Sequence, residues 1–387
     1  MKNNKNKVFK PRNIRLEHGQ MVLVSIEDLV KEEHPLYRIR NMYDWEKLSK
    51  PFKKCFKGEK ECGPKGYPVS ILFRMNFLSF LYEMSDKETE TYVSDSFIAR
   101  YFVGLNLTDP IPDETTLCRF RGRIVEHKQT DLLEKINNDI LNNVIKRGVA
   151  MGKIQILDST HTESLINRAK EKHKNKILKE KGEKPLPPKD PDASTIHKGK
   201  KKVVNSKTGE TIEIDNTYYG YKCHVSLNQA TGLVTSFDVS TGSSYDNNYA
   251  IPLIDMDIKK GFKPTVVTAD KAYDDGDFHY YLERRNILSA VILKKNRTNH
   301  KDERLNEKWK ELEKNPIRKK AKKCRYKVER KFAETKNRHG FSNCRYIGLA
   351  KYKFQAFMTI LVVNIKRILK IMPKRQFSDK QIFKIAS

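Results

Sequence analysis

The chain has 387 residues, and 77 lysines and arginines against 48 aspartates and glutamates give it a formal net charge of +29. So basic a chain suits a polyanionic partner, of which nucleic acid is the most obvious. Hydrophobic residues make up 38% and aromatic residues 10%, which excludes a globally disordered protein. At this length we expect two compact units, or one large unit with insertions.

No apolar run approaches the ~20 residues that a membrane-spanning helix needs. The longest candidate, residues 360–371, is interrupted by Lys366, Arg367 and Lys370. The basic residues 1–13 are followed by no apolar segment of the secretory type. We therefore expect no membrane association and a cytoplasmic location.

The six cysteines are scattered and form no C-x-x-C pair. Cys55 and Cys62 lie seven residues apart, without a second pair of Cys or His at zinc-site spacing. We expect reduced, mostly buried thiols rather than zinc ligands.

Residues 20–145 are predicted to be helical. Apolar residues recur every three or four positions in 69–84, and Ser85 with Glu88 forms a capping box that starts the next helix. A further helix starts after Pro112 and Asp113, and another ends before Gly148.

After Gly148 the pattern changes to short β-branched or aromatic runs bounded by Gly, Pro, Asn and Asp. Helices are expected at 246–259 and just before residue 287. Three consecutive strands followed by alternating helices and strands indicate a mixed sheet with helices on its faces. The predicted strands are 154–158, 217–227, 232–240, 264–270 and 287–295.

Two segments concentrate the positive charge. Residues 168–202 contain 13 lysines and arginines and 5 acids, together with four nearby prolines, which predicts a flexible basic arm. A merely solvated charged loop is the alternative. Residues 318–375 contain 19 lysines and arginines against two acids, Glu329 and Glu334.

Three acids are candidates for chemistry because of their positions. Asp158 and Asp270 each end an apolar run, and a carboxylate at the end of a buried strand sits on a rigid mount at a sheet edge. Glu329 lies in a predicted helix and shares one face with Arg325 and Lys336.

Carboxylates in so positive a chain suggest Mg²⁺, which prefers oxygen ligands and keeps part of its shell for water and phosphate. Three acids can hold two such ions roughly 4 Å apart and support phosphoryl transfer. Each residue also has a plainer explanation. An Asp at a strand end is often a turn former or a helix cap, and Glu329 could simply pair with Arg325 at the surface.

Short segments along most of the chain resemble one family in a fixed order. In the first half they are residues 24–39, 66–90, 96–105 and 112–124, and in the second half 156–160, 218–234, 266–275 and 325–367. They resemble the DDE transposases of bacterial insertion sequences, in the insertion-sequence-five superfamily. The family's signature around its Glu is Tyr, two residues, Arg, three residues, Glu, six residues, Lys. Arg325, Glu329 and Lys336 fit this signature, whereas Lys322 stands at the Tyr position.

The resemblance implies an α/β fold in which an all-helical N-terminal domain precedes an RNase H-like mixed-sheet catalytic domain. We place the helical, DNA-binding domain at residues 1–148 and the catalytic domain at 149–375. The basic insert is expected at 165–203 and a C-terminal tail at 376–387. A candidate recognition helix contains Arg119, Arg121 and Arg123, which could equally be ordinary solvated side chains.

The resemblance also implies roles for single residues. Asp158, Asp270 and Glu329 become the catalytic ligands of two Mg²⁺ ions, for which Mn²⁺ can substitute. Glu334, about 500° around the helix from Glu329, is off its face and is not expected to be the third acid. The residues expected to contact DNA are Arg325, Lys336, Lys322, Lys222 and Tyr221.

The implied activity is that of a transposase. Water cleaves at the transposon end to release a 3′-OH, which attacks target DNA without a covalent protein–DNA intermediate. The expected partners are double-stranded DNA, bound at its terminal inverted repeats, and a second copy of the chain, because two ends must be joined. The alternative is an inactive or repurposed nucleic-acid-binding protein of transposase descent.

Overall fold

The computed structural model describes residues 24–56, 66–204, 209, 211–298 and 302–372. The predicted C-terminal tail, 376–387, and the basic start of the chain lie outside the described residues.

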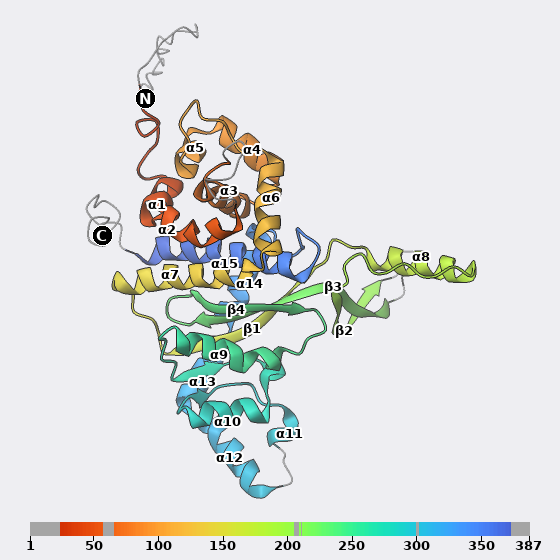
Figure 1. Cartoon of the computed structure of the whole chain (residues 1–387). Coiled ribbons are helices and arrows are strands. Elements are labelled where there is room, and N and C mark those ends of the chain that lie inside the picture. The colour runs from red at the N-terminus through yellow and green to blue at the C-terminus, as the bar shows by residue number, and fades with distance from the viewer. Residues whose placement is uncertain (1–23, 57–65, 205–208, 210, 299–301, 373–387) are drawn as a thin grey trace, which may run out of the picture.

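The N-terminal part is helical, as predicted (Figure 1). The expected capping box is present, because Ser85 Oγ accepts from the Glu88 backbone N–H and Glu88 Oε2 accepts from the Ser85 backbone N–H. Its helices are α1 (Pro35–Met42), α2 (Trp45–Ser49), α3 (Val69–Leu81), α4 (Asp86–Asp95), α5 (Phe97–Val103), α6 (Glu114–Glu126) and α7 (Leu132–Lys146), with 3₁₀ turns η1 (Lys50–Cys55) and η2 (Gln129–Asp131).

The second half contains the predicted mixed sheet, in the order β4-β3-β1-β5-β6. The ladders among β4, β3 and β1 are antiparallel, and those among β1, β5 and β6 are parallel. This is the RNase H-like arrangement, so the expected fold class is confirmed. The strands are β1 (Ile154–Glu163), β3 (Thr211–Asn228), β4 (Val234–Thr241), β5 (Val266–Thr268) and β6 (Leu288–Ser289).

The strand bounds differ from the prediction, most clearly at β1, β3 and β6. β1 continues for five residues beyond Asp158, and β3 is 18 residues long because its first part pairs with β2 (Ser194–Val204), a strand that the sequence did not reveal. β6 spans only two residues of the predicted 287–295. The apolar run there is buried but makes a ladder only with the short β5.

Helices cover both faces of the sheet (Figure 1). On one face α9 (Ala250–Lys259) and α10 (Gly276–Arg284) enclose a core with Leu157 and Val267. On the other face the buried helix α15 (Leu349–Ile371) packs against β4 and also against α3 of the N-terminal part. The remaining helices of this half are α11 (Lys295–Thr298), α12 (Glu303–Lys314), α13 (Pro316–Lys323) and α14 (Tyr326–Arg338), with 3₁₀ turns η3 (Asp246–Tyr249) and η4 (Lys271–Tyr273).

The hydrophobic core crosses the expected domain boundary at residue 148. One cluster of buried side chains joins Phe73 of α3, Phe357 of α15 and Phe237 of β4. Figure 1 shows α7 and α15 lying between the N-terminal helices and the sheet. The helical and the sheet-containing parts therefore share a core through α15.

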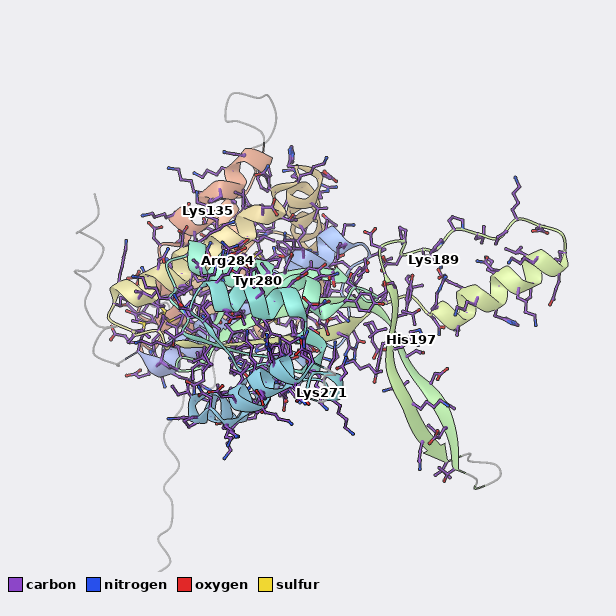
Figure 2. The ribbon with its side chains drawn as sticks, turned by 90° about the horizontal axis from the view of Figure 1, so that it is seen from below. Lys135, Lys189, His197, Lys271, Tyr280 and Arg284 are labelled. Carbon is purple, nitrogen blue, oxygen red and sulfur yellow. The ribbon has the colours of Figure 1, made fainter. Side chains whose placement is uncertain are left out.

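The basic insert projects from the body in two pieces (Figure 1), helix α8 (Arg168–Glu180) and the hairpin of β2 with the start of β3. Figure 2 shows the two pieces diverging, with Lys189 and His197 toward their roots. The expected irregular arm thus contains a helix and a strand. Lys, Arg and Glu are good helix formers, and Asn167 caps α8 by accepting from the Lys170 N–H.

Among the described residues, no helix is both long and apolar enough to cross a membrane. The described cysteines are all free thiols. Cys55, Cys223 and Cys344 are buried, as expected, whereas Cys118 is exposed and Cys324 is half-buried. Cys62 lies outside the described residues.

Candidate active site

Asp158 lies in the middle of β1, and not at its end as predicted. The pairing of β1 with β5 extends only as far as Ile156, so the neighbouring strand on that side stops two residues before Asp158. On the other side β3 still pairs with it. The side chain is 15% exposed, and its Oδ1 accepts from the Ser159 N–H at 2.8 Å. The chain therefore holds this carboxylate rigidly, beside a position that the sheet leaves open.

The electrostatic environment of Asp158 is unusual for an aspartate. Its pKa is raised to about 7, mainly by burial and in smaller part by the negative charges of Asp270 and Asp246. The Ser159 N–H and Arg325 act in the opposite direction. The raising effects of burial and of the neighbouring carboxylates therefore outweigh the positive charge of Arg325.

Asp270 follows β5 by two residues and caps η4, accepting from the Ala272 N–H at 2.9 Å. The predicted strand end was therefore two residues too late. The cap fixes the carboxylate next to the carboxyl end of β5, near enough to Asp158 for its charge to raise the pKa of Asp158.

Glu329 comes from the first turn of α14, a helix that packs against β1. Its side chain is 64% exposed. The Nη2 atom of Arg325 lies 4.0 Å from Glu329 Oε1 and 3.7 Å from Asp158 Oδ2. One guanidinium thus stands between the first and third predicted acids and links the helix to the strand.

The three acids do not form a ready-made cage. Within the described residues, no group of three His, Cys, Asp or Glu side chains is arranged to hold a metal ion. Arg325 lies where its positive charge neutralises Asp158 and Glu329. The donor chemistry nevertheless fits a hard divalent cation, because these are carboxylate oxygens and because burial, with the charges of nearby aspartates, raises the pKa of Asp158, an effect that a bound cation would oppose.

Asp246 is a site residue that the sequence did not single out. It lies at the start of η3 and accepts from Lys222 Nζ at 3.0 Å, and His224 Nδ1 is 3.7 Å away. Its charge also raises the pKa of Asp158. In the sequence Asp246 only begins a predicted helix, where an acid is an ordinary N-terminal residue, so no signal distinguished it.

Tyr221 and Lys222, both predicted to contact DNA, differ in their burial and in their partners. Tyr221 is fully buried, stacks on Tyr352 with ring centroids 4.8 Å apart and donates its hydroxyl to Asp190, so the prediction of a DNA contact is wrong. Lys222 is 15% exposed and donates to Asp246 and to the Ser244 carbonyl. It therefore supports the acidic site from within the protein.

The remaining predicted DNA contacts are partly engaged. Lys322 Nζ lies 2.6 Å from both Glu313 oxygens. Lys336 is half-buried, and burial together with the nearby charge of Lys198 lowers its pKa. Lys198 lies on β2, in the projecting hairpin. Positively charged side chains therefore extend from α14 onto this hairpin.

The candidate recognition helix corresponds to α6. Arg121 is 7% exposed and forms an ion pair with Asp86, and its Nη1 also donates to Asn76. This arginine therefore joins α6 to its neighbours in the helical part. Arg123 lies over the ring of Phe56 at 5.0 Å.

Two family models match the chain. Residues 24–123 match the family described as Transposase domain (DUF772). Residues 185–365 match the family described as Transposase DDE domain. The second match includes Asp270 and Glu329, whereas Asp158 lies before its first residue. Together the matches cover most of the helical part and most of the sheet-containing part.

An RNase H-like sheet within a DDE transposase domain defines a class of enzymes that transfer phosphoryl groups of DNA. Both matched families are transposase families, and they occur here in one chain. The chain belongs to the DDE transposases of insertion sequences.

Proposed function

We propose that the chain cleaves DNA at the terminal inverted repeats of an insertion sequence and joins the released 3′ ends to target DNA. The observation that carries this proposal is the link from Asp158 through Arg325 to Glu329, with Asp270 close enough to act on the charge of Asp158. These three acids come from distant parts of the chain. The contact of Arg325 with Asp158 is hard to explain as surface ion pairing, because Asp158 is largely buried.

We propose Asp158, Asp270 and Glu329 as the residues that would hold Mg²⁺ or Mn²⁺. Such ions, when bound, supply activation of an attacking oxygen and stabilisation of a leaving oxygen. The protein's own contribution is placement. β1 and the η4 cap hold two carboxylates rigidly, and Glu329 stands on an exposed helical turn.

Basic groups beside the acids would position the DNA. Arg325 is part of the acidic site itself, and Lys336 lies on the same face of α14. A guanidinium can hold a phosphate through two parallel hydrogen bonds, so Arg325 would exchange a carboxylate for a phosphate when DNA binds. Asp246 and Lys222 would act as positioning residues behind Asp158.

The test is nicking of a labelled duplex that carries the element's end, in Mg²⁺ or Mn²⁺. We expect metal-dependent release of a 3′-OH end, and strand-transfer products when target DNA is added. Asp270→Asn should bind the same duplex but leave it intact. A dimer is expected when two ends are bound, because joining needs both in one complex.

The alternative, a repurposed DNA-binding protein, predicts binding without cleavage under any metal. A second measurement is independent of turnover. Mg²⁺ or Mn²⁺ should raise the melting temperature of the wild-type protein and not that of Asp158→Asn, because a ligand that binds only the folded state stabilises it. Equal shifts in both proteins would contradict the assignment of Asp158.

A further inference from the structure

A second basic surface lies on a neighbouring side of the helix that carries Glu329. A hollow of about 560 Å³ is bounded by α14, by the C-terminal half of α15 and by the turn between β3 and β4. A helix advances about 100° per residue, which places the α14 side chains that line the hollow from about 40° (Ala333) to about 200° (Lys331) around the helix on one side of Glu329, whereas Arg325 and Lys336 lie about 20° to 40° on its other side. The acidic site and the hollow are therefore separate faces of one helix.

The hollow is strongly cationic. Seven lysines and arginines line it, against a single carboxylate, that of Glu334. This carboxylate is already shared, since Lys331 lies 3.0 Å and Lys366 3.3 Å from its oxygens. Burial lowers the pKa of Lys331, and the charges of Arg367 and Lys366 act in the same direction. The surface thus carries positive charge that its own acid does not neutralise.

Some of these cations are held in place, and others are available. Lys327 donates to the Gln229 carbonyl at 2.9 Å and Arg367 to the Thr231 carbonyl at 2.6 Å, which fixes the walls of the hollow. Arg330, Arg338 and Lys370 are exposed, and within the described part of the chain none of them has a carboxylate partner. The side chains of these three residues can therefore contact a ligand that extends beyond the hollow.

This chemistry fits a phosphodiester backbone. A row of phosphates is matched by several cations set along two helices, and guanidinium groups bind phosphate oxygens in a fixed geometry. The available cations stand at the exposed margin, which favours an extended ligand over a single enclosed anion. DNA is also the polyanion on which this family acts.

We propose that the hollow behind α14 binds the backbone of a second DNA segment, distinct from the segment at the acidic site. Strand transfer needs two DNA segments at once, and α14 would present one face to each. The proposal rests on the proposed function only in taking DNA as the ligand. It does not require that the protein cleaves DNA.

The test measures binding in the absence of divalent metal. Arg330→Gln, Arg338→Gln and Lys370→Gln are combined in Asp270→Asn protein, and the affinity for a labelled duplex is followed by fluorescence anisotropy over a range of salt concentrations. With six or more phosphates neutralised, the parent protein should show a log–log slope of magnitude about 5 or more. The triple variant should reduce this magnitude by about 2 to 3 and weaken binding about tenfold at moderate salt.

The matched control removes the same charge elsewhere. Lys259, Lys263 and Lys310 are exposed and are not among the residues that line the hollow, and their combined change to Gln should alter the slope by less than about 1. Arg330→Lys with Arg338→Lys should keep most of the parent slope. If the triple variant behaves like this control, the proposal is overturned.

A small anion as the true ligand is separated by a further measurement. Inorganic triphosphate is titrated into the parent protein and the triple variant by calorimetry. If the ligand is a DNA backbone, triphosphate should show no saturable binding at concentrations too low to screen the charges of the protein. Tight, stoichiometric triphosphate binding lost in the triple variant, with duplex affinity unchanged, would overturn it. Because every protein in this series is cleavage-deficient, a failure of the proposed catalytic function leaves these outcomes unaffected.

Discussion

The two glutamates of α14 have opposite environments, although they lie only five residues apart. Glu329 is 64% exposed and meets Arg325 at 4.0 Å, a contact worth less than about 1 kcal/mol. We expect Glu329→Gln to leave thermal stability almost unchanged. It should reduce the nicking rate at least about 100-fold, beyond the usual effect of losing an outer partner of a metal ligand.

Glu334→Gln is the internal control, because this carboxylate is bound by Lys331 and Lys366 and is 27% exposed. Losing it leaves the largely buried Lys331 without its acid, at a cost of about 1 to 3 kcal/mol in unfolding free energy. Nicking by the folded protein should stay within about threefold of wild type. Loss of nicking in Glu334→Gln with retention in Glu329→Gln would show that the third acid was assigned to the wrong glutamate.

His339 makes the stability of the protein depend on pH. The side chain is 1% exposed, and its ring nitrogens contact the Phe80 carbonyl at 3.0 Å and Lys366 Nζ at 2.9 Å. Burial, assisted by the charge of Lys366, lowers its pKa to about 4. Because the folded pKa lies below the unfolded value of about 6.5, the stabilisation is complete above pH 6.5 and is lost as the pH falls toward 4.

The expected result concerns the difference between two proteins. Wild type should be more stable than His339→Gln at pH 7, and this difference should shrink by about 2 kcal/mol at pH 5. Urea unfolding at both pH values measures it, and the other titrating groups largely cancel in the comparison. A difference that stays constant or grows on acidification would contradict a buried neutral imidazole.

For single residues, the motif in the sequence pointed to Arg325 and Glu329, but the sequence did not predict the direction in which a side chain points. Arg325 and Glu329 were placed on one helical face, and in the structure Arg325 lies near both Asp158 and Glu329. Tyr221 and Lys222 were both assigned to a DNA channel, although neighbours in a strand point to opposite faces. Tyr221 therefore points into the core and Lys222 toward Asp246.

Among the elements, α8 is unusual because none of its residues is buried. Its return segment comes back beside it, with the Lys189 N–H donating to Glu171 at 3.1 Å. We expect that replacing residues 172–188 by a short Gly-Ser linker changes the melting temperature by less than about 2 °C, because little apolar area is lost. Circular dichroism should show the loss of one helix and an unchanged cooperative transition.

A change where the basic arm joins the body is expected to cost more stability than the removal of α8. Asp190 is fully buried and accepts from Ser164 Oγ and from the Tyr221 hydroxyl. Asp190→Ala would leave that buried hydroxyl unsatisfied, so it should cost about 1 to 3 kcal/mol. Destabilisation by the linker variant as large as that of Asp190→Ala would mean that α8 packs on the body.

The elements that the sequence missed share a physical reason. β2 has lysines at 198, 200, 201 and 202 and pairs with β3 away from the core, so it lacks the apolar alternation that marks a strand. The buried elements were easier, because burial imposes a pattern on them. α3 and α15 are recognisable from their apolar residues alone, whereas the point at which β1 ends depends on pairing with β3.

For the whole molecule, the shared core predicts that the helical and sheet-containing parts unfold together. α15 is buried from Tyr352 to Ile368 with few interruptions, between α3 on one side and β4 on the other. Separating the two parts would expose this apolar surface to water, which is strongly unfavourable. The expected boundary at residue 148 would then separate segments of the chain and not independent folding units.

The two tryptophans make this testable, because Trp45 lies in α2 of the helical part and Trp309 in α12 beyond the sheet. They are 4% and 9% exposed, so the fluorescence of each should change on unfolding. The variant Trp309→Phe keeps only Trp45, which reports on the helical part, and Trp45→Phe keeps only Trp309, which reports on the sheet-containing part. Denaturant unfolding of each variant is monitored both by tryptophan fluorescence and by circular dichroism. A shared core requires that, within each variant, the two probes give the same midpoint and slope. If in either variant the remaining tryptophan reports a transition well separated from the loss of helix signal, the parts fold independently and α15 belongs energetically to only one of them.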